Sequence, residues 1–113
     1  MVKLILLVKR KQSLSFEEFR SYYESNHAPL AASTLPYLRN YCRNYLQAFP
    51  GQDEPVYDCV TEFWFDDAEG LSETLKFAHS SEGQFLAVDE DKFMDRSSMK
   101  TYIIDESKTN LTR

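Results

Sequence analysis

The spacing of hydrophobic and polar positions changes along the chain, and each spacing predicts one kind of element. An apolar run over residues 2–9 has the length of a strand, and we expect a central strand buried on both faces. Residues 37–47 alternate strictly, with tyrosines and arginines on one face, which predicts a second strand. The β-rich run 56–65 would complete an antiparallel hairpin with it, and residues 99–106 would form the last strand.

The first helix has the clearest beginning. Ser15 and Glu18 form a capping box, and Leu14 with Phe19 forms a hydrophobic staple around it. Pro29 cannot donate a backbone hydrogen bond, so we expect the helix to kink or restart there.

Two further helices follow from the same capping rule. Asp66 would cap a second helix, with Glu69 completing its capping box, and Ser81 with Gln84 would begin a shorter third one. The resulting order predicts an α+β, ferredoxin-like βαββαβ fold, in which a four-stranded antiparallel sheet carries its helices on one face. We expect one domain over residues 1–106 and a polar C-terminal tail over 107–113.

The sheet face without helices would be too apolar to remain exposed. Tyr102 and Ile104 of the last strand would lie there beside the apolar first strand. A homodimer that packs sheet against sheet is the simplest way to cover that face.

Composition narrows the classes of function. The net charge is −5 and no basic run is present, which argues against binding a nucleic-acid backbone. No apolar stretch reaches the roughly 18 residues that span a membrane, and no signal-peptide pattern is present, so we expect a cytoplasmic protein. Cys42 and Cys59 are predicted to be free thiols, because they lie in strands and not in a CxxC pair. We expect no metal site and no cofactor, since no phosphate loop, zinc cluster, or flavin or nicotinamide motif occurs.

One histidine stands out as a candidate for chemistry. Phe19, Tyr23 and His27 are spaced four residues apart, so one helix face carries aromatic rings and ends in an imidazole. A neutral imidazole can remove a proton next to a carbonyl or lactone and return it elsewhere. In the alternative interpretation, His27 is structural and bonds the Ser25 carbonyl that Pro29 leaves free.

Other residues could assist this histidine. Asp58, Asp89 and Asp91 could each orient it or protonate a leaving group, although each could equally be a solvated charge or a cap. Aromatic content of 14% favours either a pocket lined with rings or a core rich in phenylalanine. An asparagine amide could hold an enolate or carboxylate oxygen. The residues that we expect to contact a substrate are Tyr23, Tyr41, Asn44, Trp64 and Phe85.

Four segments carry a resemblance to a known family. FEEFRSYYESNHAPL, YLRNYCRNY, YDCVTEFWF and the closing DEDKFMD–IIDE segment occur in the same order as in EthD-type members of the dimeric α+β barrel superfamily, and the chain resembles them over nearly its whole length. This resemblance implies the fold predicted above, usually as a homodimer, with a pocket between helices and sheet in each subunit. The most specific match is the histidine before APL, His27. The chain is also similar to methylmuconolactone isomerase and polyketide cyclases, but only the first of that isomerase's two histidines has a counterpart here.

The resemblance and the residues together favour an enzyme. We expect acid/base chemistry of the lyase, cyclase or isomerase type, without cofactor, on a small aromatic, polyketide-like or lactone substrate, with His27 as general acid/base. One alternative is a cofactor-free or haem-linked monooxygenase on the same fold, and a haem would make His27 its axial ligand. The other is a non-catalytic carrier or accessory protein for a small ligand.

Overall fold

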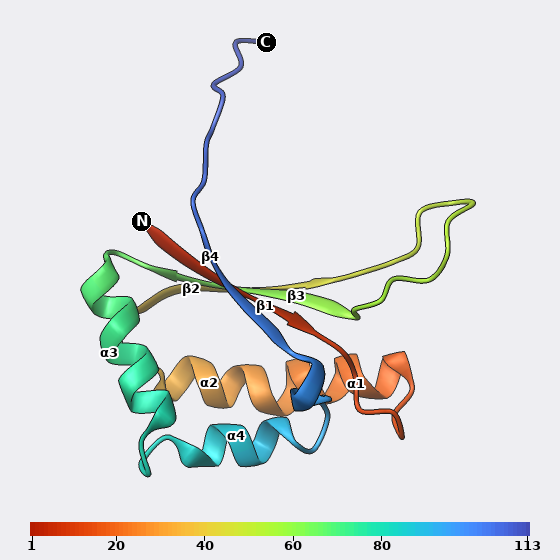
Figure 1. The fold of residues 1–113 in the computed structure, drawn as a ribbon, viewed down its shortest axis with the longest axis horizontal. Helices are drawn as coiled ribbons and strands as arrows, with labels where there is room; N and C mark the ends of the chain where they lie inside the picture. The colour runs from red at the N-terminus through yellow and green to blue at the C-terminus, as the bar shows by residue number, and fades with distance from the viewer.

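The computed structural model describes residues 1–113 and contains one four-stranded antiparallel sheet (Figure 1). The strands lie in the order β2-β3-β1-β4, and the helices cover one face of the sheet. The predicted ferredoxin-like α+β fold is confirmed, and the predicted hairpin is the β2–β3 pair. The strands are β1 (Val2–Val8), β2 (Leu38–Tyr45), β3 (Cys59–Phe65) and β4 (Lys100–Ile104).

The helical segments between the strands are short, and two of them are not α-helical. The α-helices are α1 (Phe16–Tyr22), α2 (Ala28–Thr34), α3 (Ala68–His79) and α4 (Gln84–Glu90). The π turn η1 (Tyr23–His27) joins α1 to α2, and the 3₁₀ turn η2 (Arg96–Ser98) precedes β4. None of the helices is long and apolar enough to cross a membrane.

The first helix begins as its sequence predicts. Ser15 and Glu18 form the reciprocal capping box, with hydrogen bonds of 3.1 Å and 2.9 Å. The interruption before Pro29 takes a different form from the predicted kink or restart. The backbone N–H of Ala28 bonds to the carbonyl of Tyr23, so the helix widens by one residue and continues through the proline.

The beginnings of α3 and α4 differ from prediction. Asp67, not Asp66, caps α3, and its side chain accepts a 2.8 Å hydrogen bond from the N–H of Gly70. Asp66 and Asp67 are equally good cap residues by type, so residue type alone does not decide between them. Likewise α4 begins at Gln84 after Gly83, later than the predicted start at Ser81.

The corner between α3 and α4 is unusually tight. A Cβ atom placed on Gly83 would lie 2.2 Å from the carbonyl oxygen of Phe77 and 3.0 Å from the Cα of Ala78. Because both obstacles are backbone atoms, only glycine allows the two helices to approach in this way.

Strict alternation along β2 is interrupted near its beginning. A bulge lies between Leu38 and Asn40, and Tyr37 has a φ of 63°, a conformation uncommon for residues other than glycine. Leu38 therefore shares the helix-facing side of the sheet with Tyr41, whereas the sequence pattern placed them on opposite faces.

β1 lies between β3 and β4, as expected of a central strand, but only one of its faces is fully buried. Leu4, Leu6 and Val8 are buried against the helices, whereas Ile5 and Leu7 are half-buried on the open face. The prediction of burial on both faces is therefore wrong for the single chain.

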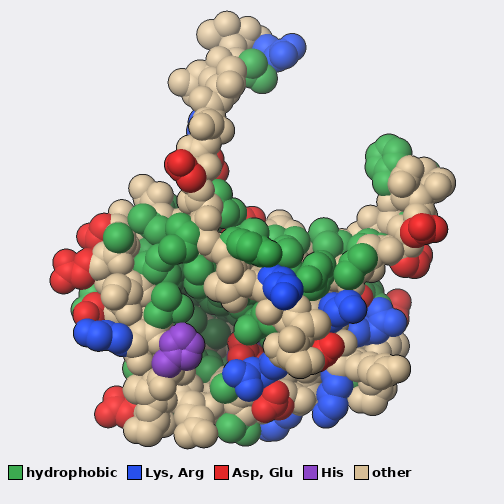
Figure 2. All heavy atoms as spheres, viewed as in Figure 1, with side chains coloured by type: hydrophobic (Ala, Val, Ile, Leu, Met, Phe, Trp, Pro, Cys, Tyr) green, Lys and Arg blue, Asp and Glu red, His purple; other side chains and the backbone are tan.

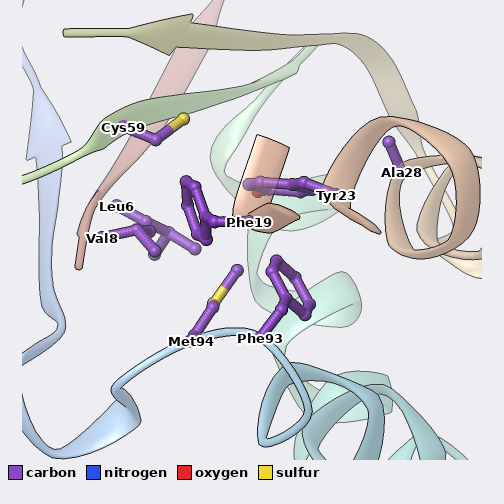
Figure 3. Packing of buried hydrophobic residues seen from close by; sticks show 8 residues of the cluster. All are labelled: Leu6, Val8, Phe19, Tyr23, Ala28, Cys59, Phe93 and Met94. Atoms are coloured by element: carbon purple, nitrogen blue, oxygen red, sulfur yellow. The ribbon is translucent and has the colours of Figure 1, made fainter. Parts of the chain in front are cut away.

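The main hydrophobic core lies between the helices and the sheet (Figure 3). Phe19 reaches it from α1 and Tyr23 from η1, and Phe93 and Met94 approach from the segment after α4. Both cysteines are free, Cys59 buried in this core and Cys42 half-buried on the other face of the sheet. The eight residues of the cluster are Leu6, Val8, Phe19, Tyr23, Ala28, Cys59, Phe93 and Met94.

The open face of the sheet carries an apolar surface flanked by two projecting segments. In Figure 2, hydrophobic side chains gather along the upper rim of the molecule, between the C-terminal segment and the β2–β3 loop. These two segments, residues 105–113 and 46–58, form no helix or strand and extend away from the body (Figure 1). The apolar residues on the open face are Ile5, Leu7, Val60, Trp64, Tyr102 and Ile104.

Candidate active site

His27 lies at the end of the π turn and faces the interior. Only 3% of its surface is exposed, and its ring packs against Tyr23 and Phe93 with centroid distances of 5.7 Å and 5.0 Å. The wide turn brings Tyr23 and His27, four residues apart, into the same buried layer. The local sequence therefore directs an imidazole into the core, where a polar group requires a partner.

That partner is Asp89 of α4. Its Oδ2 lies 2.8 Å from Nδ1 of His27, and its Oδ1 accepts a 2.6 Å hydrogen bond from the hydroxyl of Tyr22. Asp89 is thus the one of the three candidate aspartates that contacts His27. The structural interpretation predicted that His27 bonds the Ser25 carbonyl. The hydrogen bond that Nδ1 forms goes to Asp89 instead.

Burial and hydrogen bonding set the charges of this pair. Burial lowers the pKa of His27 below its ordinary value, although Asp89 opposes the shift. Burial alone would raise the pKa of Asp89, but hydrogen bonds from Tyr22 and His27 outweigh it and lower that pKa. The hydrogen bond to Asp89 raises the pKa of Tyr22 to about 12. At neutral pH the site therefore holds a neutral imidazole beside a carboxylate, with Nδ1–H donating and Nε2 free to accept a proton.

A second acid, Glu90, lies on the other side of the imidazole. Its Oε2 is 3.9 Å from Nε2 of His27, and its Oε1 is 3.4 Å from Nε of Arg96. Burial raises the pKa of Glu90 to about 7, although Arg96 opposes the shift. Sequence reasoning missed this residue. The signal available was the apolar spacing of Leu86 and Phe93, which turns this stretch of α4 toward the core.

Tyr23 and Tyr41, two of the residues predicted to contact a substrate, lie on the same side of the sheet as His27. The hydroxyl of Tyr23 is 2.7 Å from Oγ1 of Thr61, and the hydroxyl of Tyr41 donates to Tyr23 across 3.4 Å. Tyr41 also stacks on Phe63 at 4.8 Å. Burial raises the pKa of both phenols, which keeps them neutral hydrogen-bond donors.

The structure does not bring the other predicted site residues to His27. Asp58 accepts hydrogen bonds from the backbone and side chain of Arg10, at 2.7 Å and 3.1 Å. Asn44 and Trp64 lie on the open face of the sheet, where both donate to Glu62. Phe85 is 39% exposed on α4, and the Asp91 carboxylate lies 3.6 Å from Arg96.

An open groove of about 1290 Å³ lies beside this cluster. It is bounded by residues 9–12, by the start of α1, by parts of the β2–β3 loop, and by Asp91 with residues 94–97. His27 does not line this groove, nor the smaller hollow of about 240 Å³ beside α3. Arg96 does line it and also contacts Glu90, so this arginine connects the groove to the buried cluster.

Comparisons with known proteins agree with this architecture. An EthD family protein from Bacillus halodurans c-125 is 27% identical, with a TM-score of 0.72, over 95% of this chain and 99% of that one. An EthD-like protein from Ralstonia eutropha JMP134 is 17% identical, with a TM-score of 0.70, over 92% and 89% of the two chains. A dimeric protein of ferredoxin-like fold from Bacteroides fragilis is 15% identical, with a TM-score of 0.60, over 93% and 95%. No curated protein sequence matches this chain significantly. The EthD domain model matches residues 11–97, and the chain therefore belongs to the EthD domain family.

Proposed function

We propose that this protein catalyses proton transfer on a small aromatic, polyketide-like or lactone compound without a cofactor, in a reaction of the lyase, cyclase or isomerase type. The observation that carries the proposal is the buried pair of His27 and Asp89, with 2.8 Å between Nδ1 and Oδ2. A neutral imidazole held by a carboxylate is the arrangement that general acid/base catalysis requires.

The geometry assigns a role to each atom of the pair. Nε2 of His27 would accept the proton of a carbon acid next to a carbonyl, because Nδ1–H is fixed by Asp89. The resulting imidazolium would be stabilised by that carboxylate. The phenol of Tyr41 could donate to the enolate oxygen of the substrate. A positioned base of this kind contributes about 10²–10⁴ in rate.

A haem would have to take Nε2 of His27 as its axial ligand, because Nδ1 is bonded to Asp89. Glu90 faces that nitrogen at 3.9 Å, on the side where the iron would have to lie. An acid at that position suits proton transfer better than an iron ligand, so the haem-linked alternative is not proposed. A cofactor-free oxygenation and a purely binding role remain as possible outcomes of the test below.

The test uses deuterium as a reporter of proton transfer. Aryl ketones that carry a hydrogen next to the carbonyl, and unsaturated lactones, would be incubated with the protein in D₂O and analysed by mass spectrometry. We expect deuterium incorporation or an isomerised product, a loss of at least about 100-fold in His27→Asn, and little change in His79→Asn, a matched change at an exposed histidine. A compound that binds but returns unlabelled would indicate a carrier, and a gain of one oxygen atom would indicate a monooxygenase.

We also propose that the protein is a homodimer in which the open sheet faces pack together. The support is the half-exposed apolar surface of that face, which includes Tyr102 at 52% exposure, together with the dimeric relative from Bacteroides fragilis. Native mass spectrometry would give twice the 13.2 kDa monomer mass. A monomer at micromolar concentration would contradict this proposal, and extra mass on the dimer would identify a co-purified ligand.

A further inference from the structure

Glu90 is a largely buried acid, and the reaction proposed above does not assign it a role. Its side chain is 17% exposed at the end of α4. One carboxylate oxygen faces His27 Nε2 at 3.9 Å and the other faces Arg96 Nε at 3.4 Å. The two ring nitrogens of His27 therefore face two different carboxylates, one bonded and one held about 1 Å beyond hydrogen-bond distance.

The groups around Glu90 leave its charge only partly neutralised. Arg96 is the cation in contact with it, and that side chain is 41% exposed. The neighbouring acids of the same helix end, Asp89 and Asp91, oppose ionisation, and the phenol of Tyr41 on β2 also feels the carboxylate charge. Near neutral pH the protonated and ionised forms of Glu90 therefore coexist, which suits a group that both gives and takes a proton.

We propose, on the basis of the function proposed above, that Glu90 is the second proton-transfer group of this site and exchanges a proton with Nε2 of His27. In the starting state His27 is neutral and Glu90 carries its proton.

The proton balance of the cycle closes within these two residues. Nε2 of His27 takes the proton from the substrate carbon, and Glu90 gives its proton to the substrate at another atom. The site then holds an imidazolium and a carboxylate, whose attraction draws them together across the 3.9 Å gap. Transfer of the proton from Nε2 to Oε2 restores the starting state, and the substrate has gained and lost one proton. Arg96 stabilises the carboxylate while it exists.

The deciding experiment is the pH dependence of deuterium exchange in Glu90→Gln. Wild type should be active only in a window, since exchange requires neutral His27 at the acid limb and protonated Glu90 at the alkaline limb near pH 7. Glu90→Gln should lose at least tenfold in rate and lose the alkaline limb. Asp91→Asn is the matched control, because it removes an exposed acid that also contacts Arg96. It should keep the limb, moved to slightly lower pH because Asp91 helps to raise the pKa of Glu90. An alkaline limb near pH 7 in Glu90→Gln would overturn the proposal.

A second readout separates this proposal from the proposed function. In wild type labelled with ¹⁵N-histidine, the Nε2 shift of His27 should show a step near pH 7, from ionisation of Glu90, and the step should be absent from Glu90→Gln. If no compound exchanges deuterium but the step is present, the proposed chemistry fails while the coupling of the two groups stands. If wild type exchanges deuterium but shows no step, the role of Glu90 is overturned and His27 acts without it.

Discussion

The hydroxyl oxygen of Tyr23 and Oγ1 of Thr61 lie 2.7 Å apart, with 1% and 0% of the two residues exposed. This contact joins the π turn to β3 in the centre of the core. It holds the segment that ends in His27 against the sheet, so the position of the candidate base depends on a polar contact between two buried hydroxyls.

Replacing Thr61 by Val should therefore destabilise the fold without changing its shape. The change keeps the side-chain volume but leaves the hydroxyl of Tyr23 with only the 3.4 Å contact from Tyr41. We expect a loss of about 1–3 kcal/mol in the free energy of unfolding, measured by urea denaturation. The double variant with Tyr23→Phe should cost less than the sum of the two single changes, and strict additivity would contradict the contact.

Asp89→Asn should lower the pKa of His27 further. The Asp89 carboxylate opposes the effect of burial by favouring the imidazolium, and an amide would not do so. The histidine titration followed by NMR should move to lower pH, and deuterium exchange should fall. Tyr22→Phe removes a neighbouring hydrogen bond to the same carboxylate and should have the smaller effect on the imidazole. An unchanged titration in Asp89→Asn would contradict the pairing.

The free energy of unfolding should depend on pH through Glu90. Its pKa rises from 4.5 to about 7 on folding, so the native state binds more protons than the unfolded state between these pH values. The stability that Glu90 contributes is present below about pH 4.5 and is lost as the pH rises to 7. We expect a loss on the order of 1–3 kcal/mol, which Glu90→Gln should remove.

Urea denaturation of wild type and Glu90→Gln from pH 5 to 8 would measure this difference. Comparison at each pH cancels the opposite effect of His27, whose lowered pKa removes stability as the pH falls below 6.5. Asp91→Asn serves again as the control, and a pH-independent difference between wild type and Glu90→Gln would contradict the prediction.

The two cysteines should differ in reactivity. Cys59 is fully buried, and burial raises its pKa to about 11, so iodoacetamide should not modify it in the folded protein at pH 7.5. Cys42 lies half-buried on the open sheet face and should react when the chain is monomeric. Its modification rate should fall with increasing protein concentration if the open faces pair. A concentration-independent rate would speak against that dimer, and Cys42→Ser identifies the modified residue.

Local signals explain why the fold was predictable and its details were not. The capping box of Ser15 and Glu18 is complete within four residues, so the sequence alone locates that helix start. The bulge after Leu38 follows a φ of 63° at Tyr37, a conformation that tyrosine itself does not favour and that the surrounding structure must hold. Alternation by itself cannot reveal such a shift.

The candidate site, like the fold, could be predicted from the sequence only in part. His27 could be found from its helix face and from the proline that follows it. Its pairing with Asp89 joins residues 62 positions apart, a distance over which sequence spacing carries no geometry. The sequence predicts that Asn44 and Trp64 contact a substrate, because an amide can hold an oxygen and an aromatic ring can line a pocket. Strand register instead places both on the face of the sheet opposite His27.

The tight corner at Gly83 extends the list of positions on which activity depends. Any side chain there would push against backbone atoms of α3, and α4 would have to move, carrying Asp89 and Glu90 away from the imidazole. A screen for inactive variants should therefore recover changes at Gly83 together with those at His27. Such variants would keep every reactive group and would fail only because Asp89 and Glu90 are displaced from His27. A mutational scan would therefore mark as essential a residue that has no functional group.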